Sequence, residues 1–302
     1  MTERTDPTTP ADPRVPTTGT LPVPGATLRY EVRGDGPLLL LIPGGSGDAD
    51  LFDGVAPLLA DRFTVASYDP RGVGRSTLEG PAGDQQVEVH AADAGRLIDL
   101  LSPDEPAYVA GCSSGAIASL HLLVRHPDRL RLVVAHEPPL TETLPDPAPA
   151  RALFAAVRDT AAREGVGPAM ALLGTGLGGP AFPGVPEAPV RPVAEPGPVP
   201  LPPHGGDKWA RTQAGSPYFL RHILVPFTRW SPDMAQLKDV SAQLLLGVGA
   251  DSEHLVLGHL AHHLAETLGT GLATFPGGHL GPTEHPAEFA EALNEALRAA
   301  HT

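Results

Sequence analysis

Two adjacent serines stand among small residues in the stretch Gly111-Cys112-Ser113-Ser114-Gly115, directly after an apolar run. Glycines two positions before and after Ser113 let a strand turn sharply into a helix, which exposes the side chain at the apex. A serine hydroxyl held there can attack a carbonyl carbon if a histidine takes its proton and a carboxylate orients that histidine. The pattern therefore predicts Ser113 as a nucleophile.

Attack on a carbonyl creates a negatively charged oxygen, which backbone N–H groups can stabilise. Ser114 opens the helix that follows the apex, so its amide is expected to point at the place where the oxyanion forms. Gly44 and Gly45 follow an earlier apolar run and let the backbone approach a substrate. We therefore predict an oxyanion hole formed by the amides of Gly45 and Ser114.

A histidine suited to act as the base lies near the C-terminus. His279 stands in the glycine-rich stretch "FPGGHLGP", between the last strand-like run and the last helical segment. Among the 13 histidines it alone follows the tip of a predicted sheet strand. His285 precedes Pro286 and is expected to start the helix instead. We predict that His279 is the general base.

Two carboxylates are candidates for orienting the histidine, and the residues alone leave both open. Glu137 ends a strand-like run that is expected to lie beside the strand carrying Ser113, although it could equally be a solvated carboxylate before a proline turn. Asp251 follows a later strand-like run, but it is also placed to cap a helix that begins near Glu253.

These residues need a framework that brings distant segments together. Apolar runs alternate with helix-like segments along most of the chain. The runs occupy residues 37–43, 63–69, 107–112, 130–137, 241–250 and 271–277. The helices are expected at residues 90–101, 114–126, 253–268 and 286–300. Unbroken apolar strands separated by helices indicate an α/β fold whose mostly parallel sheet is covered on both faces.

The composition divides the chain into four segments. They are a disordered Thr/Pro-rich tail (1–20), the first part of the core (21–142), a helical lid (143–236) and the second part of the core (237–302). A hairpin is expected to turn at Pro24-Gly25. The lid contains a Pro/Gly-rich tract from Gly174 to Gly206. Its aromatic residues, Phe219 and Trp230 in particular, are predicted to contact the substrate, with ordinary packing as the alternative.

Charge and cysteine content restrict the partners and the compartment. A net charge of −14 argues against nucleic acids and anionic membranes as partners. The single cysteine, Cys112, fits a reducing compartment, and neither a membrane span nor a signal-peptide core is visible. We therefore expect a cytoplasmic protein that acts on a small molecule. The sequence leaves open whether the chain forms a homodimer.

Two further patterns are set aside. The stretch "GTGLGG" (174–179) formally fits a dinucleotide-binding loop, but it follows a helix rather than a strand. His259 and His263 lie four apart on a predicted helix, yet no glutamate follows His259, and a solvated helix face is the better interpretation. No metal or other cofactor is therefore expected.

The motifs as a whole resemble those of the α/β-hydrolase superfamily over residues 21–300. The stretch "YDPRGVGRS" (68–76) adds a turn that is structural in that superfamily. More narrowly, "GCSSGA", "HPDRLRLVVAHEPP" and "FPGGHLGPTEHP" resemble the zearalenone-type lactone hydrolases, which cleave a resorcylic macrolactone. In that subgroup the acid lies in a His-Glu-x-Pro segment, which implies Glu137. The more usual superfamily position for the acid corresponds to Ser252 rather than Asp251.

The resemblance implies a cofactor-independent serine hydrolase that cleaves a carboxylic ester or a lactone, with macrolactones such as zearalenone among the candidate substrates. The same triad would also serve a thioesterase or a cofactor-free perhydrolase. A ligand-binding relative without catalysis is the alternative from another class. The complete set of serine, histidine and acid argues against that alternative.

Overall fold

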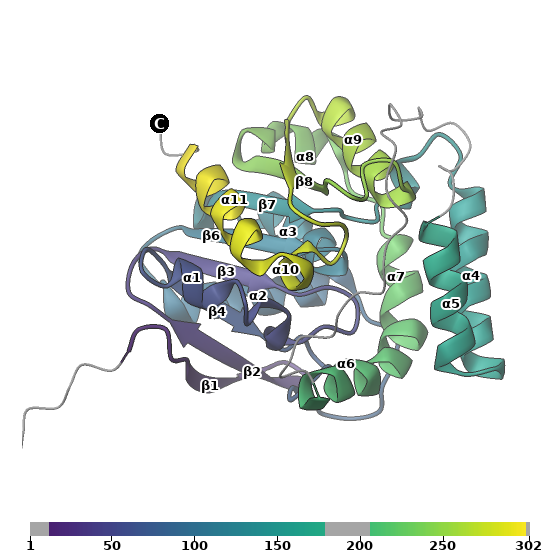
Figure 1. Ribbon diagram of the computed structural model, residues 1–302, viewed down its shortest axis with the longest axis horizontal. Coiled ribbons are helices and arrows are strands. Elements are labelled where there is room, and N and C mark those ends of the chain that lie inside the picture. Colours follow the sequence, from purple (N-terminus) through teal and green to yellow (C-terminus); the bar gives the residue numbers. More distant parts are fainter. Residues whose placement is uncertain (1–11, 179–205, 300–302) are drawn as a thin grey trace, which may run out of the picture.

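A single twisted sheet forms the centre of the computed structural model, which describes residues 12–178 and 206–299 (Figure 1). The order in the sheet is β1-β2-β4-β3-β6-β7-β8-β9, and β5 pairs with β2. The strands are β1 (Thr17–Val23), β2 (Ala26–Arg33), β3 (Leu38–Ile42), β4 (Thr64–Tyr68), β5 (Thr77–Leu78), β6 (Ala107–Cys112), β7 (Leu130–His136), β8 (Leu244–Gly249) and β9 (Gly271–Phe275). From β4 to β9 every neighbouring pair is parallel, whereas β2 pairs antiparallel with β1, β4 and β5.

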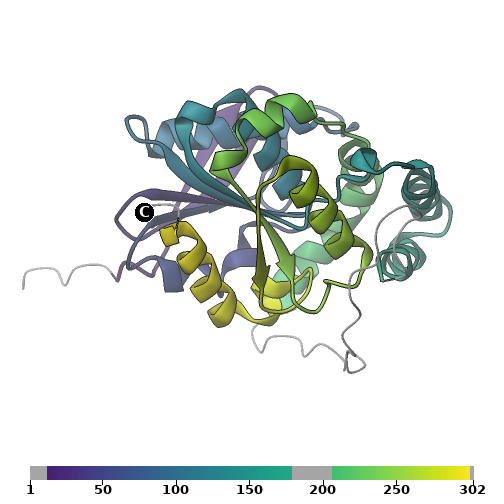
Figure 2. The same ribbon diagram turned by 90° about the horizontal axis from the view of Figure 1, so that it is seen from above.

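Helices cover both faces of this sheet (Figures 1 and 2). One face packs against α1 (Ala56–Leu59) and α11 (Pro286–Ala299), and the other against α2 (Val87–Leu101), α3 (Ser114–Arg125), α8 (Met234–Asp239) and α9 (Val256–Leu268). The turn of α10 (Gly281–Glu284) precedes α11, and η1 (Ala49–Phe52) precedes α1. This is the α/β-hydrolase architecture that the resemblance implied.

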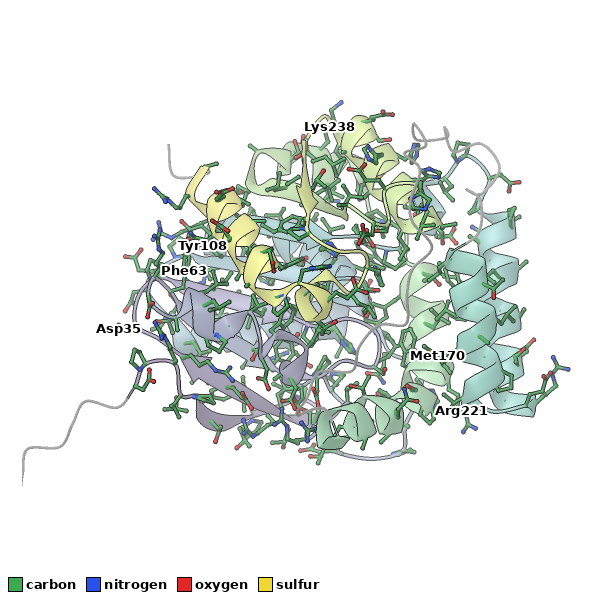
Figure 3. The ribbon with its side chains drawn as sticks, viewed as in Figure 1. Asp35, Phe63, Tyr108, Met170, Arg221 and Lys238 are labelled. Carbon is green, nitrogen blue, oxygen red and sulfur yellow. The ribbon has the colours of Figure 1, made fainter. Side chains whose placement is uncertain are left out.

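The continuous apolar runs are explained by burial on both faces. Along β3, Leu39 and Leu41 join the core beneath α1 and α11, whereas Leu40 and Ile42 join the core beneath α2 and α3. Alternate side chains of a strand point to opposite faces, so a strand covered on both sides must be apolar throughout. On the α11 side, Phe63 and Tyr108 meet edge-to-face with ring centroids 5.7 Å apart (Figure 3).

A helical insertion separates β7 from β8. It contains η3 (Thr141–Thr143), α4 (Ala148–Arg163), α5 (Val166–Leu177), α6 (Gly206–Tyr218), the π-helical turn η4 (Phe219–Ile223) and α7 (Leu224–Thr228). The α4–α5 pair stands at the right-hand edge of the molecule in Figures 1 and 2, and α7 lies between this pair and the sheet core.

The π-helical turn has a local cause in the sequence. Pro226 has no N–H group, so it cannot bond to the carbonyl of His222 four residues earlier. That carbonyl instead accepts a hydrogen bond of 2.8 Å from the Gln85 amide, just before α2. This hydrogen bond ties the π-helical turn to the segment that precedes α2.

The structure differs from three of the sequence-based expectations. Strand β1 begins at Thr17, inside the stretch expected to be a tail, because seven residues pair in register with β2 around the predicted turn. Helix α5 continues through Gly174 to Leu177, where a Cβ atom at Gly176 would lie 2.5 Å from a Leu153 methyl group. Gly176 therefore allows α5 to pack closely on α4. Helix α9 begins at Val256 rather than near Glu253.

Parts of two expectations lie outside the described residues. These are the first eleven residues of the predicted tail and residues 179–205 of the Pro/Gly-rich tract. Within residues 12–178 and 206–299, no helix is both long and apolar enough to cross a bilayer.

Candidate active site

Ser113 occupies a strained apex between β6 and α3. Its φ of 54° and ψ of −121° lie where residues with a side chain are rarely found, and such a conformation costs on the order of 1–3 kcal/mol. The flanking glycines make the turn possible, since a Cβ atom at Gly115 would lie 2.3 Å from the Ile42 carbonyl oxygen. The Ser113 amide donates to the carbonyl of His136 at 2.9 Å, which fixes the apex beside the end of β7.

The loop after β3 lies directly against this apex. A Cβ atom at Gly44 would come within 2.6 Å of Ser113 Cβ, so only glycine permits the approach. The amide of Gly45 donates a 2.9 Å hydrogen bond to the hydroxyl of Ser114. Ser114 is the first residue of α3, where the backbone N–H groups have no partner within the helix. The structure thus brings both predicted oxyanion donors to Ser113.

His279 and Glu137 meet at the same edge of the sheet. His279 follows β9, and its Nδ1 lies 2.7 Å from Oε2 of Glu137, the residue after β7. Glu137 has a φ of 46° and is completely buried. Its other oxygen, Oε1, accepts hydrogen bonds from the Gly249 amide at 2.9 Å and from the Ser252 hydroxyl.

These contacts determine the charge of Glu137. Burial alone would raise its pKa, but hydrogen bonds from His279 and Ser252, together with the nearby imidazoles of His279 and His136, lower the pKa to about 2. The carboxylate is therefore ionised at neutral pH. It accepts the Nδ1–H of His279, which leaves Nε2 as the basic nitrogen of the neutral ring.

The predicted base, His279, is close to solvent and is not hydrogen-bonded to the predicted nucleophile, Ser113. The His279 side chain is 31% exposed, and no hydrogen bond joins the described side chains of Ser113 and His279. Hydrogen bonds between a catalytic base and its nucleophile are often long without substrate and shorten in the reacting complex. The arrangement can therefore transfer a proton once a substrate closes the site.

Asp251, the other candidate acid, lies apart from this group. It is exposed, its amide donates to the Gly277 carbonyl at 3.0 Å, and no hydrogen bond joins the described carboxyl group to His279. The expected helix cap is also wrong, because α9 begins at Val256 and its N-cap residue is Leu255. Of the two carboxylates, the structure places Glu137 against the histidine.

A narrow cavity of about 10 Å³ opens beside the oxyanion donors, roughly the space of one water molecule. Its walls are Ile42, Pro43, Gly45, Pro70, His90, Ser114, Gly115, Ala118, Ile223 and Phe227. Burial lowers the pKa of His90 to about 3, so the ring is neutral, and it packs edge-to-face on Phe227 at 5.0 Å. The cavity is thus uncharged and mostly apolar.

The aromatic residues predicted to contact substrate lie elsewhere. Phe219 is buried in the packing of the insertion against the core. The Trp230 indole donates to Glu88 at 3.1 Å and packs edge-on against His121. Neither residue lines the cavity, so the packing alternative describes them better.

Ile223, Phe227 and His90 were missed as candidate substrate contacts. The four-residue spacing of Ile223 and Phe227 indicates that they share a helix face. That spacing does not say which core residues the face meets. Only the folded structure places it beside Ser114.

The turn after β4 supports the oxyanion loop, in keeping with its expected structural role. The buried Asp69 carboxylate accepts hydrogen bonds from the Ala49 amide at 3.0 Å and the Arg75 amide at 2.7 Å. Ser76 donates to the Asp69 carbonyl at 2.6 Å. These bonds hold the chain just after the oxyanion loop.

The insertion is tied to the same region by an ion pair. Arg211 of α6 lies 3.2 Å from Asp48, and it also pairs with Asp50. Burial and the nearby Asp69 raise the pKa of Asp48, while the two arginines Arg211 and Arg75 oppose that shift. The pairs therefore link α6 to the chain that follows Gly45.

The two histidines His259 and His263 make separate contacts in the structure. His259 is 5% exposed, so the expected solvated helix face is wrong for this residue, and His263 contacts the Thr143 carbonyl at 3.1 Å. No group of three or more His, Cys, Asp or Glu side chains with metal-binding geometry occurs in the part of the chain that the structure describes.

Burial raises the pKa of Cys112 to about 12, which keeps the thiol protonated.

Comparisons with known proteins agree with this architecture. A family model described as the alpha/beta hydrolase fold matches residues 37–175. An uncharacterized hydrolase of Bacillus subtilis (strain 168), YraK, is 35% identical over 284 residues, which cover 92% of this chain and 95% of YraK.

Two solved structures share the fold over most of both chains. A thermophilic esterase from Thermogutta terrifontis aligns over 95% of this chain and 100% of its own, with a TM-score of 0.70 and 21% identity. The enol-lactonase from Burkholderia xenovorans LB400 aligns over 93% and 100%, with a TM-score of 0.64 and 17% identity. These likenesses show the fold, and the extensive match to YraK together with the family model shows that the chain belongs to the α/β-hydrolase superfamily.

Proposed function

We propose that this protein hydrolyses a carboxylic ester or lactone through an acyl-enzyme, with Ser113 as nucleophile, His279 as general base and Glu137 as the acid. The observation that carries the proposal is the 2.7 Å contact between Glu137 and His279 beside the strained Ser113 apex. Three segments distant in the sequence supply these side chains at one edge of the sheet. The carboxylate and the imidazole together form a charge-stabilised acceptor for the proton of the half-buried Ser113 hydroxyl.

In the proposed first step, Nε2 of His279 takes the hydroxyl proton while Ser113 Oγ bonds to the carbonyl carbon. The carbonyl π electrons move to the oxygen, and the amides of Gly45 and Ser114 stabilise the resulting charge. Collapse of the intermediate breaks the bond to the leaving oxygen, which receives the proton from His279. The alcohol departs, or in a lactone stays attached at the far end of the opened ring.

Water then hydrolyses the acyl-enzyme with the help of the same groups. His279 removes a proton from the water as it attacks the acyl carbon, and the second oxyanion occupies the same site. Collapse returns the electron pair to Ser113 Oγ, which His279 reprotonates. The products are a carboxylic acid and an alcohol, or a hydroxy acid from a lactone, and the route uses only side chains and water.

Two features favour lactones among the candidate substrates. The His-Glu-Pro-Pro segment around Glu137 resembles that of the zearalenone-type lactone hydrolases. The Burkholderia xenovorans neighbour is an enol-lactonase with the same fold. We propose that the helical insertion acts as a lid, which must shift to admit a macrolactone because the present cavity is water-sized.

A fluorophosphonate probe together with a substrate panel tests the proposal. The purified protein should be labelled at Ser113, and the Ser113→Ala variant should remain unlabelled and lose about 10³-fold or more in kcat. The panel should contain p-nitrophenyl esters, a thioester and macrolactones including zearalenone. Labelling without turnover of any ester or lactone would contradict the substrate class, and normal turnover by Ser113→Ala would exclude the mechanism.

A further inference from the structure

Ser252 stands in the turn between β8 and α9, and its hydroxyl contacts Oε1 of Glu137. We infer that Ser252 is a positioning residue that holds the Glu137 carboxylate in the orientation His279 requires. This inference rests on the proposed function of Glu137 as the acid of the triad.

A glutamate needs such a restraint because its carboxylate rotates freely. The last side-chain torsion of glutamate has a broad energy minimum, so packing alone does not fix the plane of the two oxygens. Here Oε2 faces His279, while Oε1 is held by two donors, the Gly249 amide at 2.9 Å and the Ser252 hydroxyl. Both donors come from one turn, and together they set the direction in which Oε2 points.

The turn that carries Ser252 is itself well fixed. The Ser252 amide donates to the Gly249 carbonyl at 3.0 Å, and the Ser252 carbonyl accepts from the Leu255 amide at 2.9 Å. Ser252 is 2% exposed, so water does not compete for its hydroxyl. The donor is therefore in place before a substrate binds, which is the condition for efficient positioning.

The electrostatics of the site agree with this role. The titratable groups that influence or are influenced by Glu137 are His279 across the site, His136 beside it in the chain and Cys112 at the end of β6. Burial raises the pKa of Glu137, and the Ser252 hydroxyl is one of the groups that lower it. Removal of the hydroxyl would raise the pKa of Glu137 and would also leave its carboxylate free to turn away from His279.

The test compares the kinetics of three variants. Ser252→Ala removes the hydroxyl, Ser252→Thr keeps one, and Thr274→Ala removes a hydroxyl elsewhere. The Thr274 side chain is exposed and donates to Glu253 rather than Glu137, so Thr274→Ala serves as the control. We expect Ser252→Ala to lower kcat about 10- to 100-fold with KM within about twofold, as for loss of one hydrogen bond to a charged group. Ser252→Thr keeps a hydroxyl and should recover most of the rate, and Thr274→Ala should leave kcat unchanged.

A double variant separates positioning from a structural effect. If Ser252 acts through Glu137, Ser252→Ala should cost nothing further in a Glu137→Gln background, whereas a general loss of packing would add its full effect there. A kcat of Ser252→Ala within twofold of wild type, or an additive loss in the double variant, would overturn the inference. The Ser113→Ala arm reports on the proposed function separately, because its activity does not depend on what Ser252 does.

Discussion

The Gly45 amide donates a 2.9 Å hydrogen bond to the Ser114 hydroxyl, so the two residues whose amides are the predicted oxyanion donors are also joined to each other. This contact joins the loop after β3 to the first turn of α3 beside the Ser113 apex. In the proposed mechanism, the Gly45 amide exchanges this partner for the substrate oxygen when the tetrahedral intermediate forms. The Ser114 hydroxyl therefore acts as a stand-in acceptor in the resting site.

Ser114→Ala removes that acceptor but keeps the backbone amide of residue 114. Because both backbone donors remain, we expect kcat to change by less than about tenfold, whereas loss of a true oxyanion donor costs about 10²- to 10³-fold. Steady-state kinetics on one p-nitrophenyl ester, with Ser113→Ala as the inactive reference, provide the measurement. A loss of 10²-fold or more would mean that the hydroxyl itself stabilises the oxyanion.

Phe227 limits the cavity next to the oxyanion donors, so a smaller side chain should admit larger substrates. Phe227→Leu enlarges the cavity with less disturbance than a change to alanine. We expect the ratio of kcat/KM for a butanoate ester to that for an acetate ester to rise about tenfold, the typical size of such discrimination. Phe219→Leu is the matched control, since Phe219 is also buried but does not line the cavity. Equal shifts in both variants would show that the cavity does not select substrates.

His136 makes the stability of the fold sensitive to mild acid. Neither ring nitrogen has a hydrogen-bond partner among the described residues, and burial lowers the pKa of His136 from 6.5 to about 4. As the pH falls, His136 is therefore protonated in the unfolded chain at a higher pH than in the folded protein. The stabilisation that comes from burying the neutral ring is complete above pH 6.5 and is lost as the pH falls toward 4. The buried His90, with its pKa lowered to about 3, acts in the same direction.

His136→Phe should reduce this sensitivity, because the ring already packs against both Phe275 and Phe289. The free energy of unfolding can be measured in urea at pH 7 and at pH 5. Between these two pH values it should fall by about 1–2 kcal/mol less in His136→Phe than in wild type. The exposed His126 supplies the control, as His126→Gln should leave the pH dependence unchanged. An identical fall in His136→Phe and wild type would contradict the assignment.

Local patterns made the sharp turn at Ser113 and its flanking elements predictable. Glycines around Ser113 and apolar runs on both sides of the turn are visible in one short stretch, and β6 and α3 lie within a residue of the expected bounds. The choice between Glu137 and Asp251 could not be made from the residues, because it depends on how β7, β8 and β9 bring their following loops together. The resemblance to a known subgroup was needed to favour Glu137.

The substrate side of the site was the least predictable part. Phe219 and Trp230 share an aromatic character with Phe227, and nothing in their types distinguishes a residue that lines a cavity from one that packs behind it. The distinction depends on which residues of η4 and α7 the folded chain brings beside Ser114, where Ile223 and Phe227 line the cavity and Phe219 does not.

The most direct test of the account is the rate of Glu137→Gln compared with that of Asp251→Asn on the same ester. Glutamine keeps the shape of Glu137 but cannot hold the Nδ1–H tautomer of His279 or balance its positive charge, and the equivalent change in a serine protease costs about 10⁴-fold in kcat. We predict a loss of that order for Glu137→Gln. For Asp251→Asn we predict a rate within about twofold of wild type, because the exposed Asp251 carboxyl makes no hydrogen bond to His279 among the described residues. A crippled Asp251→Asn beside a near-normal Glu137→Gln would contradict the account and move the acid to the loop after β8.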